Sequence, residues 1–86
     1  MFDYGDTVKI KKNSPEKYCP EQLGAVCGII PIDNKVLAEF YNEEFGSTVY
    51  TIEFGFNGYY EAAIPERYLE IFEEYNNFDN GGNDYD

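Results

Sequence analysis

The sequence predicts an all-β protein built as one small five-stranded barrel with a short acidic tail. Its 86 residues suffice for a single domain. Nine Tyr and seven Phe supply much of the apolar content, with no Trp and one Met, and aromatic residues fit the half-buried face of a sheet. Short segments of alternating apolar and polar residues, separated by Gly, Pro and Asn, support the same class because this pattern is typical of small barrels.

The first two predicted strands lie on either side of a long loop. Thr7–Lys12 alternates with period two, so that its valine and isoleucine face inward and its lysines outward. Asn13–Gly24 contains two prolines and little periodicity, and we expect a loop that Tyr18 pins to the barrel. Ala25–Ile30 is apolar on both faces, as a central strand would be, and Gly28 within it indicates a bend or the close approach of another segment.

The sequence pattern of residues 36–64 predicts three more strands. Val36–Tyr41 alternates between two faces and is interpreted as the third strand, with Asn42–Ser47 as the loop that follows it. Thr48–Phe54 has the clearest alternation in the sequence. The Asn-Gly dipeptide within Gly55–Gly58 is a strong hairpin signal, so we expect Tyr59–Ile64 to return as the fifth strand.

The end of the domain carries a short helical turn before the last strand. Pro65 stands where one turn of helix would begin, whereas Glu70–Tyr75 fits either a closing strand or a helical turn. Residues 76–86 are acidic and poor in apolar side chains, which predicts a disordered tail and a domain over residues 1–75. These features describe an SH3-like barrel, since an OB-type barrel would need a helix that residues 42–47 are too few to form.

Acidic residues are concentrated in the second half of the chain, and the formal net charge is −11. Residues 1–35 hold five lysines and five acids, whereas residues 36–86 hold twelve acids and only Arg67. The negative electrostatic field of these acids repels phosphate backbones, which argues against nucleic-acid binding. The same field favours association with a basic protein surface. The same acidity is also compatible with simply keeping a small protein soluble.

The sequence lacks the residues that most catalytic and cofactor sites require. It has no His, which is the commonest general base and a frequent zinc ligand. It also has no glycine-rich loop of the kind that cradles phosphate. Carboxylates that are adjacent in an exposed loop, such as Glu43 and Glu44, do not resemble the paired acid and base of a hydrolase. We therefore predict a protein that is not an enzyme and that binds no cofactor.

The cysteines and the polar tail do not indicate a metal site or a disulfide scaffold. Cys19 and Cys27 are interpreted as free thiols that behave as small buried hydrophobes, although a cross-link between them stays open. Asp79–Asp86 is acidic but lacks the spacing of a calcium-binding loop. No apolar stretch has the length of a signal peptide or of a membrane span, so we expect the cytoplasm and no membrane partner.

The candidate binding residues are acidic and aromatic side chains around the predicted third and fourth strands and the hairpin. Tyr and Phe make good interface anchors, and carboxylates around them suit a basic partner. An alternative interpretation assigns Phe40, Tyr50, Phe54 and Tyr60 to the core, with Tyr41, Phe45 and Tyr59 covering its edges. The predicted contact residues are Glu39, Tyr41, Glu43, Glu44, Phe45, Glu53 and Tyr59.

Four segments resemble the immunity protein 31 family: Tyr4–Ile10, Leu23–Ile29, Val49–Phe54 and Ile64–Glu70. The resemblance covers residues 2–72. It implies a small all-β antitoxin of a bacterial polymorphic-toxin system, which binds and blocks a cognate toxin in the cytoplasm. The resemblance includes no binding motif, so none of the candidate contact residues is taken from the family.

Two functions are compatible with the sequence. The first is an immunity protein that acts as a monomer and neutralises a basic toxin through an acidic, aromatic-rich surface. The second is an SH3-like adaptor that binds a peptide or an enzyme surface through its long first loop, around Tyr18. Replacement of Glu43 and Glu44 would distinguish them, because only the first depends on these carboxylates.

Overall fold

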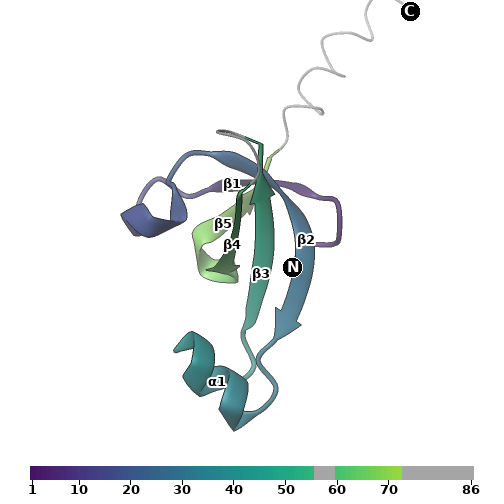
Figure 1. The fold of residues 1–86 in the computed structure, drawn as a ribbon, viewed down its shortest axis with the longest axis vertical. Coiled ribbons are helices and arrows are strands. Elements are labelled where there is room, and N and C mark those ends of the chain that lie inside the picture. The colour runs from purple at the N-terminus through teal and green to yellow at the C-terminus, as the bar shows by residue number, and fades with distance from the viewer. Residues whose placement is uncertain (56–59, 73–86) are drawn as a thin grey trace, which may run out of the picture.

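The computed structural model describes residues 1–55 and 60–72. Five antiparallel strands form one sheet in the order β4-β3-β2-β1-β5, accompanied by one short α-helix (Figure 1). The protein is therefore mostly β, as predicted, while the predicted tail and Tyr59 lie outside the described residues. The elements are β1 (Thr7–Ile10), the 3-10 turn η1 (Glu16–Tyr18), β2 (Leu23–Pro31), α1 (Lys35–Tyr41), β3 (Thr48–Phe54), β4 (Tyr60–Pro65), the 3-10 turn η2 (Glu66–Tyr68) and β5 (Leu69–Ile71).

The long hairpin of β2 and β3 forms the centre of the sheet. Its register shifts between Val26 and Gly28, which marks an irregularity in β2. A Cβ atom on Gly28 would lie 2.8 Å from Thr51 Oγ1 and 2.9 Å from its Cβ, closer than real side chains approach. Glycine is required here because the two strands come so close together. This confirms the close approach predicted at Gly28.

The main core cluster contains apolar side chains from all five strands, and Ile32 and Val49 are buried outside it. Val8 and Ile10 are fully buried, as the alternation in the first strand predicts. Tyr18, in the first loop, packs against the cluster and holds the loop to the sheet, which confirms its predicted role. The buried members of the cluster are Val8, Ile10, Val26, Tyr50, Ile52, Phe54, Ile64 and Leu69.

The last strand returns to the first. The turn η2 follows Pro65 directly, so the predicted helical turn is confirmed, and the described start of the ambiguous closing segment is a strand. β5 pairs with β1, and the N–H of Lys11 donates to the carbonyl of Tyr68 at 2.8 Å. β4 and β5 are the two edges of the sheet. No pairing between them closes it within the described ranges, so the structure is an open sheet and lacks the closure that we predicted.

The predicted strand Val36–Tyr41 is wrong, because this segment is the helix α1. Asn34 caps its start, with Oδ1 accepting from the N–H of Leu37 at 2.9 Å. Asn42 ends it in the left-handed conformation, with φ of 55°. β2 pairs directly with β3, so this segment is the connection between them and has no strand beside it. The sheet still has five strands because β5 takes the fifth place.

Candidate functional site

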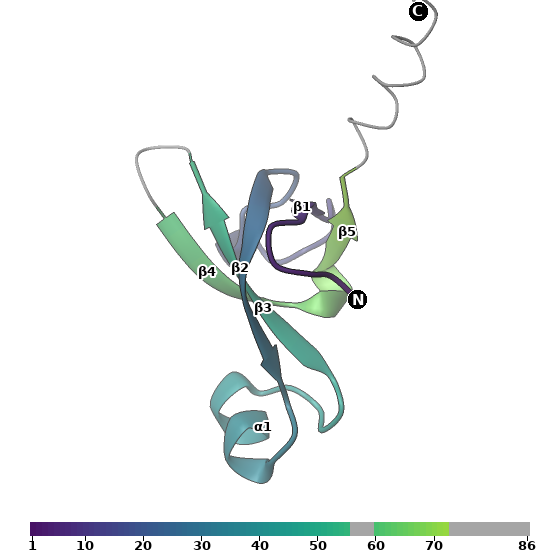
Figure 2. The same cartoon turned by 90° about the vertical axis from the view of Figure 1, so that its right-hand side faces the viewer.

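Helix α1 projects beyond the end of the β2–β3 hairpin, away from the other strands (Figures 1 and 2). None of its residues is buried. No residue of the helix belongs to the main core cluster, although Leu37, Ala38 and Tyr41 are half-buried, and an asparagine cap stands at each end. The protruding end of the hairpin is a surface that a partner can reach from several sides.

The loop of residues 42–47 brings the chain from α1 into β3 along a defined path. Gly46 has a φ of 94°, a conformation that favours glycine. The hydroxyl of Ser47 donates to the carbonyl of Glu44 at 2.6 Å. The N–H of Gly46 donates to the carbonyl of Ile32 at 2.8 Å, and the N–H of Ile32 donates to the carbonyl of Ser47 at 2.9 Å. These bonds position the backbone that carries the candidate contact residues.

Three large apolar side chains are exposed on α1 and its loop. Val36 and Phe40 stand four residues apart, which places them on the same side of the helix, and they are 74% and 75% exposed. Phe45 in the loop is 72% exposed. The ring of Phe40 contacts that of Tyr41 edge to face, with centroids 4.8 Å apart. Of the four rings that the alternative placed in the core, Tyr50 and Phe54 are buried there, as it predicts, whereas Phe40 and Tyr60 are exposed.

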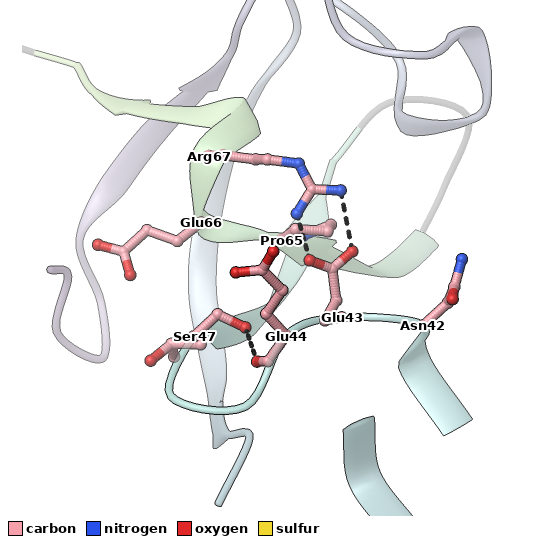
Figure 3. Close-up of a pocket in the computed structure, with 8 residues that line it drawn as sticks. Asn42, Glu43, Glu44, Ser47, Pro65, Glu66 and Arg67 are labelled. Atoms are coloured by element: carbon pink, nitrogen blue, oxygen red, sulfur yellow. Dashed lines mark hydrogen bonds and ion pairs between the residues drawn. The ribbon is translucent and has the colours of Figure 1, made fainter. Parts of the chain in front are cut away.

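Glu43 turns away from solvent and forms an ion pair with Arg67 of η2 (Figure 3). The two nitrogens of the guanidinium donate to the two carboxylate oxygens, with Nη2 3.1 Å from Oε2. The side chain of Glu43 is only 6% exposed, whereas that of Arg67 is 56% exposed. A two-point contact of this kind constrains direction as well as distance. It ties the loop after α1 to the turn before β5.

Arg67 continues this contact toward the first loop. Its guanidinium lies over the ring of Tyr68, 4.7 Å from the centroid, and the rings of Tyr68 and Tyr18 are 5.4 Å apart. The hydrogen bonds to Glu43 are the main reason why the pKa of Arg67 is raised above its ordinary value. Lys17 lies over the other ring of the pair, 5.2 Å from the centroid of Tyr18. The cations on this side of the molecule are thus already engaged with carboxylate and aromatic groups.

A groove of about 740 Å³ separates the loop after α1 from η2 (Figure 3). Three carboxylates and one guanidinium belong to its lining, and the guanidinium is the one paired with Glu43. Glu66 also contacts the N-terminal amine of Met1 at 2.9 Å. The balance of charge suits a cationic group better than an anion. The groove is lined by Asn42, Glu43, Glu44, Ser47, Thr48, Pro65, Glu66 and Arg67.

Five of the seven predicted contact residues lie together on α1 and the loop after it. Glu39, Glu44 and Phe45 are exposed and can reach a partner, and Tyr41 is half-buried. Glu43 is the exception, because its carboxylate is occupied by Arg67. The structure therefore gives Glu43 a structural role in the loop and leaves the other four as candidates for contact.

The remaining predicted residues do not belong to this cluster. Glu53 lies near the opposite end of β3, where it pairs in register with Glu61 of β4. Tyr59 lies outside the described residues. Sequence reasoning missed Val36 and Phe40, because a strand interpretation turned one face of the segment inward. The asparagine N-cap before a segment rich in Lys, Leu, Ala and Glu is the signal that could have identified the helix.

The two cysteines are free, as predicted, and both are half-buried. The thiol of Cys27 donates to Oε2 of Glu61 at 3.7 Å. Burial is the largest cause that raises the pKa of Cys27, and the negative charges of Glu61 and Glu53 add to it. The thiol is therefore held in its protonated form at neutral pH. A protonated thiol is a weak nucleophile and a weak metal ligand.

In the part of the chain that the structure describes, no three His, Cys, Asp or Glu side chains converge in a way that could hold a metal ion. Within the same ranges, no helix has the length and apolar character needed to cross a membrane. No protein-family model, no curated protein and no solved structure matches this chain. The resemblance to the immunity protein 31 family accordingly stays a prediction.

Proposed function

We propose that this chain is an immunity protein: a monomer without catalytic activity that binds a basic bacterial toxin in the cytoplasm and blocks it. Its binding surface is the protruding end of the β2–β3 hairpin. The observation that supports this most directly is that exposed rings and exposed carboxylates share this end, with Phe40 and Phe45 beside Glu39 and Glu44. Aromatic anchors with charged neighbours are the usual composition of a tight protein interface.

The charge of this surface favours a cationic partner. Arg67 is the only base after residue 35, and it is already paired with Glu43. Lys35, one helical turn before Glu39, is the cation of α1, so the exposed carboxylates of Glu39 and Glu44 leave an excess of negative charge toward an approaching surface. They attract lysine and arginine and accelerate association. They repel phosphate, so we propose neither nucleic acid nor an anionic membrane as a partner.

The chemistry of the described residues supports binding more than catalysis. Glu43 is the most enclosed carboxylate of the groove, and both of its oxygens accept from Arg67. The raised pKa of Cys27 keeps its thiol protonated. The sequence has no His to act as a general base. A protein of this composition can act by covering the functional surface of its partner.

We further propose that the fold is an SH3-like arrangement. Its supports are the position of β5 beside β1, the 3-10 turn η2 before β5 and the long loop between β1 and β2. The four segments that resemble the immunity protein 31 family include parts of β1, β2, β3 and β5. In such a fold the loops at the ends of the strands can vary without disturbing the core, and the insertion of α1 between β2 and β3 fits this pattern.

The test is a titration of the full chain with the toxin domain encoded by the neighbouring gene. We expect a micromolar or tighter complex in low salt that weakens as salt is added, because exposed charges are screened. The double variant Glu39→Lys and Glu44→Lys should weaken binding at least tenfold and flatten the salt dependence. Glu70→Lys on β5 is the matched control and should change both far less. The absence of a complex at micromolar concentration in low salt would reject this function.

A second candidate function is peptide binding at the first loop, and one contact favours it. Tyr18 of η1 and Tyr68 of η2 form a ring pair with half-exposed faces, flanked by Lys17 and Arg67. Aromatic pairs on a surface are suitable platforms for an extended peptide. In that case Tyr18→Ala would abolish binding, whereas reversal of Glu39 and Glu44 would have little effect.

A further inference from the structure

We propose that Val36, Phe40 and Phe45 form an apolar plug that enters a hydrophobic cleft of a basic protein partner, with lysine and arginine at the rim of that cleft. This inference rests on the proposed function and makes it more specific. Three apolar side chains then supply most of the binding energy, and two of them, Val36 and Phe40, were not among the contact residues predicted from the sequence. The carboxylates attract the partner and set its orientation. The plug is defined by these three residues.

The three residues of the plug lie close together in the connection between β2 and β3. Val36 and Phe40 lie on one side of α1, and Phe45 follows in the short loop that the helix leads into. All three are more than 70% exposed, although the core of this small protein is formed by other rings and aliphatic side chains. Helix α1, which carries Val36 and Phe40, lies beyond the end of the β2–β3 hairpin (Figure 2). A convex apolar surface fits a concave site on another molecule.

The plug is also held in one conformation before it binds. Asn34 and Asn42 cap the helix at its two ends. The pair between Glu43 and Arg67 holds the loop against η2. A binding element that is already ordered loses less conformational entropy on association. Two caps and an ion pair therefore order a helix and loop that supply no residue to the main core cluster.

The charges around the plug indicate which kind of molecule binds to it. Glu39 and Glu44 flank the plug, and Lys35 is the only cation of α1. In a two-fold contact between two copies, the same surface meets itself, so both sides would carry the same excess of exposed carboxylates over cations, which disfavours the contact. An anionic lipid surface would be repelled for the same reason. Charge complementarity leaves a protein whose apolar cleft is surrounded by basic side chains.

The experiment measures binding of the full-length protein to the toxin domain encoded by the neighbouring gene, at two salt concentrations. Phe40→Ala and Phe45→Ala should each weaken the complex at least tenfold while leaving the salt dependence unchanged, because they remove apolar contacts and no charge. The melting temperature should stay the same, since neither ring is in the core. Tyr4→Ala is the matched control, an exposed ring in the first turn of the chain, and should not affect binding.

Each outcome bears on the inference. If the double variant Phe40→Ala and Phe45→Ala binds within twofold of the parent, while charge reversal at Glu39 and Glu44 still weakens the complex, the plug is rejected and the proposed function stands. If the parent forms no complex, both are rejected. If sedimentation shows a dimer of the parent that Phe40→Ala converts to a monomer, the occupant is a second copy and the inference is wrong.

Discussion

At the scale of single residues, the decisive contact is the one between Glu43 and Arg67. The sequence places Glu43 beside Glu44 in a loop, and both appear there as equivalent surface acids. The structure separates them, because Glu43 is nearly enclosed and doubly bonded to Arg67, whereas Glu44 is exposed. The partner of Glu43 comes from 24 residues further along the chain, a separation that no local pattern reveals.

Removal of Arg67 should therefore destabilise the protein. In Arg67→Met the carboxylate of Glu43 stays largely buried without its donors, and we expect a loss of about 1–2 kcal/mol, reduced from that of a fully buried pair because the guanidinium is 56% exposed. Urea denaturation measures this change. Glu66→Gln, which alters an exposed pair with the N-terminal amine, is the control and should cost less than about 0.5 kcal/mol.

The double variant Glu43→Met and Arg67→Met adds a further comparison. It should regain most of the stability lost in Arg67→Met, since no unpaired carboxylate is left in the enclosed position. If Arg67→Met were as stable as the parent protein, the ion pair would have no structural role. The argument that it orders the loop after α1 would then fail.

At the scale of elements, α1 shows how strongly a strand pattern can mislead when the segment has no neighbour to pair with. Val36–Tyr41 can be divided into two alternating faces, although Glu39 is its only charged residue, and period two has meaning only where a sheet covers one face. The segment connects two paired strands and lies beyond their ends. Local hydrogen bonds at the caps then decide its conformation, because no strand offers backbone partners.

Loss of the N-cap should loosen this helix without unfolding the protein. Asn34→Ala removes the acceptor for the N–H of Leu37, which costs about 1 kcal/mol and should raise amide exchange in α1 by about fivefold. The global melting temperature should hardly change, because α1 has no buried residue. Asn42→Gly is the matched control, since glycine adopts a φ of 55° readily. Unchanged exchange at Leu37 and Ala38 in Asn34→Ala would contradict the role of the cap.

At the scale of the whole molecule, a small five-stranded sheet carries a large excess of negative charge. The net charge of −11 lies in the second half of the sequence, and within the described residues most of these acids occupy exposed positions on α1, its loop and the later strands. Repulsion among like charges opposes the compact state. A net charge of this size also favours solubility.

Salt should therefore stabilise the isolated protein while it weakens the complex. Raising sodium chloride from about 10 mM to 500 mM shortens the screening length to a few ångströms, and we expect the melting temperature to rise by about 5 °C. Calorimetry or circular dichroism measures this shift. The variant Glu39→Lys and Glu44→Lys carries less negative charge and should show a smaller rise. A melting temperature that falls with salt would mean that attractive ion pairs outweigh the repulsion.

Local patterns in the sequence were enough to predict a mostly β protein, the hydrophobic strands around Val8 and Ile52, the close approach at Gly28 and the helical turn after Pro65. These features depend on local periodicity, turn chemistry and backbone sterics, which a single segment contains. The three-dimensional structure was needed to establish that no strand lies beside Lys35–Tyr41, that Phe40 is exposed and that Glu43 faces Arg67. These features depend on which segments become neighbours, because pairing and burial are properties of contacts between distant parts of the chain.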